Sequence, residues 1–81
     1  MVSVKLLRFG ILSELIEEEM TEIEFEQDLS VEQFKQALID ILPQLRPYSN
    51  FTIAINEVYA SSDQIIQDGD VLALIPPVAG G

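Results

Sequence analysis

One stretch near the middle of the chain has the pattern of a long amphipathic helix. Its apolar residues recur at helical spacing and are Val31, Phe34, Leu38 and Ile41. Ser30 and Gln33 have the spacing of a capping box, in which each side chain satisfies the other residue's free backbone N–H group. Pro43 ends the helix, because the residue before a proline is pushed out of the helical conformation. In a chain of 81 residues, this single helix can cover one face of one sheet.

The segments around this helix have the patterns of short strands. The expected strands are residues 2–9, 21–26, 51–55, 58–59 and 71–75. In the second of these, Ile23 and Phe25 alternate with glutamates, which is typical of a half-buried strand. The last has apolar residues on both faces, as a central strand does. A short helix is expected after Gly10, with one apolar side made of Ile11, Leu12, Leu15 and Ile16. Residues 43–50 are expected to form a loop.

The order of these elements predicts the fold. The first and last strands are both strongly apolar, and if they lie side by side and parallel at the sheet centre, the result is an α+β fold of the β-grasp, ubiquitin-like type. It has a mixed sheet, one main helix on one face and a short extra helix. Ferredoxin-like layouts need a second long helix, which this chain lacks. We expect one β-grasp domain over residues 1–76 and a flexible C-terminal tail over residues 77–81.

Composition excludes several classes of function. Four Lys or Arg residues stand against fourteen Asp or Glu, for a net charge of −10. This balance disfavours nucleic acid and anionic membranes as partners, since both are bound through clustered cations. The absence of Cys and His excludes disulfides, thiol or imidazole nucleophiles and the usual zinc sites. No signal peptide or membrane-spanning stretch is recognisable, so we expect a soluble cytoplasmic protein that binds no metal.

More than half of the acidic residues lie between Glu14 and Asp28. Their contiguous spacing disfavours a calcium loop, and two interpretations stay open: a solvated face, or a patch that steers toward a basic partner. Asp68, Gly69 and Asp70 predict a tight turn rather than a catalytic carboxylate pair. Tyr48 and Tyr59 are expected to be structural.

The most unusual stretch is the end of the chain, "IPPVAGG". A disordered end is the common fate of terminal residues. However, Pro76 and Pro77 cannot donate ladder hydrogen bonds, so the chain must leave the sheet there in a set direction. Residues 78–81 then reach out by about 13 Å in extended form, at ~3.3 Å per residue.

Glycine at the tip has a chemical consequence. Gly80 and Gly81 lack Cβ atoms and can thread a channel too narrow for other residues. The reactive group delivered is the α-carboxylate of Gly81, a poor electrophile that needs activation, most simply as an acyl-adenylate made with ATP on another enzyme. The sequence therefore predicts a functional tail, with Ala79 and Gly80 threading and Gly81 reacting. The residues nearest the exit, which are expected to contact the partner, are Ile75, Pro76, Pro77 and Val78. Leu7 and Phe9 either extend that surface or belong to the core.

The stretch "AINEVYASSDQIIQDGDVLALIPPVAGG", residues 54–81, resembles the C-terminal half of the small subunits of molybdopterin synthase. That family shows an Asn after the third strand, an Asp-Gly-Asp turn, an apolar strand and Pro-Pro-Val-x-Gly-Gly. The opening strand followed by "FGILSELI" also agrees, and the likeness spans the whole chain. Residues 17–28 are the looser region, being more acidic than the family pattern.

The resemblance implies a β-grasp sulfur carrier with no bound cofactor. In the family, an E1-like adenylating enzyme consumes ATP to activate the terminal carboxylate, here that of Gly81, and a sulfur donor converts it to a thiocarboxylate. The tail then inserts into the large subunit and delivers sulfur to cyclic pyranopterin monophosphate, which forms the molybdopterin dithiolene. The implied assembly is a heterotetramer of two small and two large subunits, with catalytic side chains in the large subunit.

Three alternatives stay open. A sulfur carrier for thiamine thiazole synthesis has the same fold and Gly-Gly end, although such chains usually lack the Pro-Pro pair. A ubiquitin-like modifier would join Gly81 to lysines by isopeptide bonds. A plain interaction domain would have a tail without function.

Overall fold

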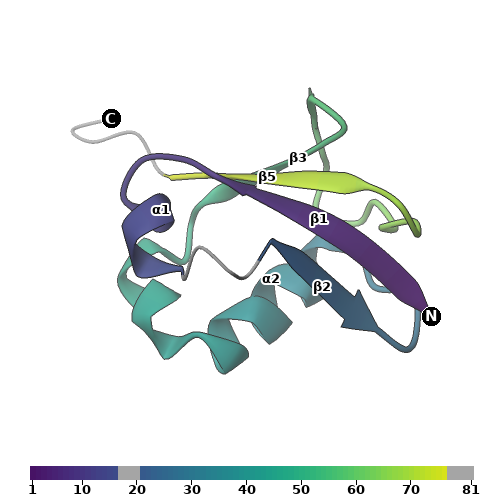
Figure 1. Ribbon diagram of the computed structural model, residues 1–81, viewed down its shortest axis with the longest axis horizontal. Coiled ribbons are helices and arrows are strands. Elements are labelled where there is room, and N and C mark those ends of the chain that lie inside the picture. The colour runs from purple at the N-terminus through teal and green to yellow at the C-terminus, as the bar shows by residue number, and fades with distance from the viewer. Residues whose placement is uncertain (17–20, 77–81) are drawn as a thin grey trace.

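The computed structural model describes residues 1–16 and 21–76 as a single sheet with helices against one face (Figure 1). Its elements in chain order are β1 (Val2–Arg8), α1 (Leu12–Leu15), β2 (Glu22–Phe25), α2 (Val31–Ile41), the 3₁₀ helix η1 (Pro43–Tyr48), β3 (Thr52–Ile55), β4 (Val58–Tyr59) and β5 (Val71–Ile75). Each expected strand and helix is present at nearly the expected bounds. The flexible tail predicted for residues 77–81 lies outside the described residues.

The sheet has the strand order β2-β1-β5-β3-β4. β1 and β5 pair in parallel at the centre, with Leu6 opposite Leu72, and the other pairs are antiparallel. The first and last strands therefore lie side by side, and the prediction of a ubiquitin-like β-grasp fold is confirmed. Because β5 is hydrogen-bonded on both sides, the end of this strand is held firmly within the sheet.

Helix α2 covers one face of the sheet, and its capping box is confirmed (Figure 1). Ser30 Oγ accepts a hydrogen bond from the Gln33 N–H group at 3.2 Å, and Gln33 Oε1 accepts one from the Ser30 N–H group at 2.9 Å. The predicted stripe is wrong at one position. Ile41 is 63% exposed, whereas Ile39 is buried. Ile39 belongs to the core cluster, so the buried side of α2 passes through Ile39 and not Ile41 near its end.

The expected loop over residues 43–50 is also wrong in part, since residues 43–48 form η1. Pro43 occupies its first turn, where the missing N–H group costs no hydrogen bond. Leu45 is fully buried, and its N–H group donates to the Leu42 carbonyl at 2.9 Å. Burial of Leu45 thus holds in helical form a segment whose two prolines favoured a loop.

The Asp68–Asp70 turn has the structural role predicted for it. Asp68 Oδ1 accepts from the Ser3 N–H group at 2.8 Å. Asp70 accepts from the side chain of Asn56 at 3.0 Å and from the Gln67 N–H group at 2.8 Å. Gly69 has a φ of +89°, in the left-handed region that favours glycine. The hydrogen bonds of these carboxylates connect the turn before β5 to Ser3 in β1 and to Asn56 after β3.

Candidate functional site

Strand β5 has two different faces. Leu72 and Leu74 are buried on the side of α2, whereas Val71, Ala73 and Ile75 are only half-buried on the other side. No helix of the described residues lies over that second face, which we call the outer face (Figure 1). The residue before the tail therefore emerges on an open surface rather than inside the core.

An apolar row crosses the outer face. Leu7 lies opposite Ala73, Ala73 opposite Ala54, and Ala54 opposite Tyr59, so the row spans four strands. Leu7 is 46% exposed and Tyr59 71% exposed, and the two alanines between them leave the row shallow. Tyr48 packs against the core as a structural residue, but Tyr59 does not.

A second row lies at the end of β5. Ile75 is opposite Thr52 on one side, and continuing the parallel register past Arg8 and Leu74 puts Phe9 on the other. Phe9 is 49% exposed. Leu7 and Phe9 thus belong to the surface and not to the core, which decides the alternative left open by the sequence. The two rows form the outer apolar patch, made of Leu7, Phe9, Ala54, Tyr59, Ala73 and Ile75.

The root of the tail packs on Gly10. Pro76, the last described residue, is half-buried, and a Cβ atom added to Gly10 would lie 2.9 Å from Pro76 Cγ. Gly10 also has a φ of +56°, a conformation that other residues adopt at a cost. Sequence reasoning treated Gly10 only as the end of a strand and missed this contact. The glycine allows the chain to leave β5 pressed against the β1–α1 connection.

Of the seven residues predicted for the site, the structure describes Ile75 and Pro76, and it places both at the exit point. The others, Pro77, Val78, Ala79, Gly80 and Gly81, lie outside the described residues. The outer apolar patch lies beside the exit. The prediction names Ile75 and leaves Leu7 and Phe9 open, but it lacks Ala54, Tyr59 and Ala73. The signal for the patch was present in the register: once β1 and β5 are parallel, Leu7 and Phe9 must share a face with Ile75.

Charge collects at the opposite end of the outer face. Lys5 lies opposite Glu22 on one side and Val71 on the other, and Ser3 lies opposite Glu24. Glu22, Glu24, Glu26 and Asp28 are all exposed, and Glu14, also exposed, lies instead in α1 near the exit of the tail. In residues 1–16 and 21–76, no group of acidic side chains is arranged to hold a metal ion. The same part of the chain contains no helix long and apolar enough to cross a membrane.

Comparisons with known proteins agree with this geometry. The model of the ThiS family matches residues 6–81. A relative from Mycobacterium tuberculosis, named molybdopterin synthase sulfur carrier subunit, is 32% identical over 100% of both chains.

Two solved structures have the same fold over nearly their full length. A putative molybdopterin converting factor, subunit 1, from Pyrococcus furiosus has a TM-score of 0.83 at 26% identity, covering 96% of this chain and 100% of that one. SAMP1 from Haloferax volcanii has a TM-score of 0.76 at 26% identity, covering 98% and 99%. Since the family model spans almost the whole sequence and the mycobacterial relative matches from end to end, this chain belongs to the ThiS family.

Proposed function

We propose that this protein is the sulfur carrier subunit of a molybdopterin synthase and that sulfur travels on the α-carboxyl group of Gly81. The observation that carries the proposal is the pairing of an "IPPVAGG" end with an open apolar patch beside the point where that end leaves the sheet. The names of the mycobacterial and Pyrococcus proteins support it, because both are subunits in molybdopterin synthesis. The proposed location is the cytoplasm.

The chemistry begins at a carboxylate that does not react by itself. On an E1-like enzyme, a Gly81 carboxylate oxygen attacks the α-phosphate of ATP, and pyrophosphate leaves. The terminal sulfur of a donor protein's persulfide attacks the acyl-adenylate, AMP leaves, and an acyl disulfide forms. A second thiol then cleaves the sulfur–sulfur bond, which leaves the thiocarboxylate on Gly81 and a disulfide between that thiol and the donor cysteine. This chain has no Cys, so no thiol of its own can capture the activated acyl carbon.

Delivery then takes place on a second protein. The tail enters the large subunit, where the thiocarboxylate sulfur forms a C–S bond in place of a C–O bond of cyclic pyranopterin monophosphate. Water then cleaves the acyl–sulfur bond and returns the Gly81 carboxylate, and two such deliveries build the dithiolene. Catalytic side chains belong to the large subunit, in a heterotetramer of two small and two large subunits. The carrier itself binds no cofactor, and ATP is consumed by the adenylating enzyme.

The fold supports this division of roles. β5 is paired on both sides, so the root of the tail has a fixed position relative to the outer apolar patch. A partner that covers the patch meets the tail at a defined distance and direction, which favours insertion of the tip into a narrow channel. Leu7, Phe9 and Ile75 supply the exposed apolar area that such docking buries.

The proposal is tested by weighing the intact protein after incubation with a cognate adenylating enzyme, ATP and a sulfur donor. The expected product carries one sulfur in place of one terminal oxygen. A variant lacking Gly81 serves as the matched control and should keep the fold but gain no sulfur. An unchanged mass of the wild-type chain, under conditions where a known carrier reacts, would overturn the assignment.

The likeness to SAMP1 and to the ThiS family favours testing two other roles. A protein modifier would appear in cell extracts as conjugates on lysines, whereas a carrier would remain a free small protein. A carrier for thiazole synthesis would support thiamine formation and not molybdopterin formation when it replaces the gene product in a deletion strain.

A further inference from the structure

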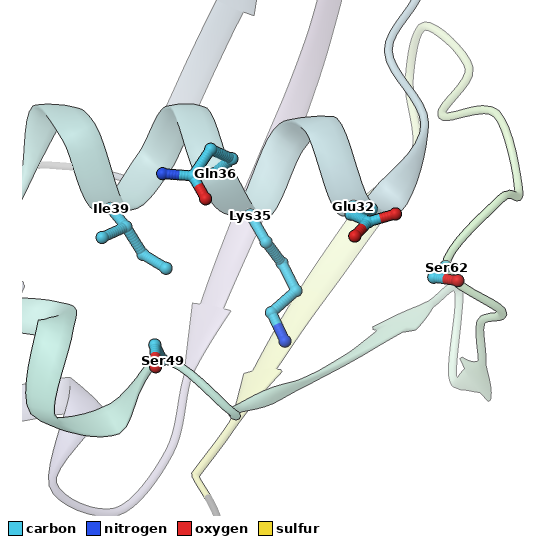
Figure 2. Close-up of a pocket in the computed structure, with 6 residues that line it drawn as sticks. All are labelled: Glu32, Lys35, Gln36, Ile39, Ser49 and Ser62. Atoms are coloured by element: carbon cyan, nitrogen blue, oxygen red, sulfur yellow. The ribbon is translucent and has the colours of Figure 1, made fainter.

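Two shallow hollows meet where α2 faces the start of β3. The first has a volume of about 350 Å³ and is lined by Glu32, Lys35, Gln36, Ile39, Ser49 and Ser62 (Figure 2). The second has a volume of about 250 Å³, shares Lys35 and Ser62 with the first, and continues along Phe51, Thr52 and Ile53. Because they share two lining residues, the hollows adjoin each other, and we call them together the α2–β3 groove.

Lys35 lies at the junction of the two hollows. Figure 2 shows its side chain extending from α2 toward the start of β3, between Ser49 and Ser62. Its Nζ atom donates to the Phe51 carbonyl and lies 4.8 Å from the centre of the Phe51 ring. Burial lowers the pKa of Lys35, and the negative charge of Glu32 opposes that effect.

Lys35 makes no ion pair in the described part of the chain, although Glu32, three residues earlier in α2 and lining the same hollow, acts on it through its charge. Both of its direct partners in the described part of the chain, a backbone carbonyl and an aromatic ring, are uncharged. This is unusual in a protein with fourteen acidic residues and four basic ones. An ammonium group has three N–H donors, and the Phe51 carbonyl uses one, so donors remain for a ligand in the groove.

The groove is continuous with the surface already described. Thr52 lines the second hollow and also lies opposite Ile75 at the end of β5. The outer apolar patch and the α2–β3 groove therefore meet around the start of β3. A protein that holds the tail and covers the patch can reach Lys35 by extending one segment past Thr52.

We propose that the α2–β3 groove receives an extended segment of the large subunit and that an Asp or Glu side chain of this segment pairs with Lys35. Two adjoining hollows beside α2 and the start of β3 fit an extended chain. Exposed Ser49 and Ser62 offer hydroxyl groups for its backbone, and the buried Ile39 lines the floor of the first hollow. The inference rests on the proposed function, since it adds a second contact to the partner that receives the tail.

The test measures the affinity of the complete chain for the cognate large subunit by titration calorimetry at low and high salt. Lys35→Met keeps most of the aliphatic stem and removes the charge, and Lys35→Arg keeps the charge. Lys5→Met makes the same change in net charge outside the groove. Ser62→Phe fills the junction of the hollows without altering Lys35. Circular dichroism confirms that each variant is folded.

We expect Lys35→Met to weaken binding about tenfold or more, because it removes one partner of an interfacial ion pair. We expect Ser62→Phe to weaken binding by a similar factor, because its ring occupies the junction of the hollows. Lys35→Arg should restore most of the affinity, Lys5→Met should change it by less than about twofold, and the effect of Lys35→Met should shrink at high salt. Equal binding by wild type, Lys35→Met and Ser62→Phe would overturn the groove assignment and leave the proposed function intact. Failure of the wild-type chain to bind the large subunit would overturn both. Saturable shifts of Lys35 resonances with inorganic phosphate alone would instead indicate a small-anion site and refute the peptide assignment.

Discussion

Replacing Gly10 with alanine tests how the root of the tail is held. The φ of +56° costs an alanine roughly 1 kcal/mol relative to glycine. The new Cβ atom would also lie 2.9 Å from Pro76 Cγ, closer than Cβ atoms approach other atoms in real structures, so Pro76 must shift. We expect the free energy of unfolding to fall by about 2–3 kcal/mol in total, of which ~1–2 kcal/mol comes from the contact with Pro76.

Gly69→Ala is the matched control for the backbone cost. Gly69 also has a positive φ, +89°, but an added Cβ atom would have no neighbour within 4 Å. The difference between the two variants therefore measures the contact with Pro76. Urea unfolding followed by circular dichroism gives both values, and combining Gly10→Ala with Pro76→Ala, which removes Cγ, should recover ~1 kcal/mol or more. If Gly10→Ala is no more destabilising than Gly69→Ala, or if the double variant shows no recovery, the proposed packing of Pro76 on Gly10 is wrong.

Three further outcomes are expected. Glu57 has a φ of +74° in the β3–β4 turn, so Glu57→Gly should raise the free energy of unfolding by about 0.5 kcal/mol in urea titrations; a loss of stability would contradict this. Ser30→Ala removes one half of the capping box and should lower the free energy of unfolding by ~1 kcal/mol. An unchanged free energy of unfolding would show that the cap does not stabilise the protein. Burial lowers the pKa of Lys35 in the folded chain. Between this lowered pKa and the usual value of about 10.4, the unfolded chain binds more protons than the folded chain, so the free energy of unfolding should rise with pH in that range. Comparison with Lys35→Met isolates that contribution, and identical pH profiles would refute it.

Local patterns were sufficient to predict most of the fold. The capping box at Ser30, the alternation around Ile23 and the apolar run of β5 each depend on neighbouring residues in the chain, and each is present in the structure. The pairing of β1 with β5 also followed, because two strongly apolar strands need the centre of the sheet.

The sequence-based predictions were wrong where the burial or conformation of a residue depends on segments that are distant in the chain. The periodicity of α2 placed Ile41 in the core, but in the folded chain Ile39 joins the core and Ile41 is exposed. Pro43 and Pro47 favoured a loop, but burial of Leu45 holds a 3₁₀ helix. The contact between Gly10 and Pro76 joins residues far apart in sequence and has no local signature. Lys35 likewise gave no signal, since its position beside Phe51 depends on how α2 lies against β3.

The central place of β5 in the sheet also determines when the growing chain can complete its fold during synthesis. β5, the last strand of the described residues, is the one that β1 and β3 both require, so neither can complete its pairing until residues 71–75 have left the ribosome. Nascent chains cut short before this point lack the middle of their sheet and cannot form a stable domain. A chain stopped before residue 71 also lacks Ala73 and Ile75, so a protein that recognises the outer apolar patch cannot bind it.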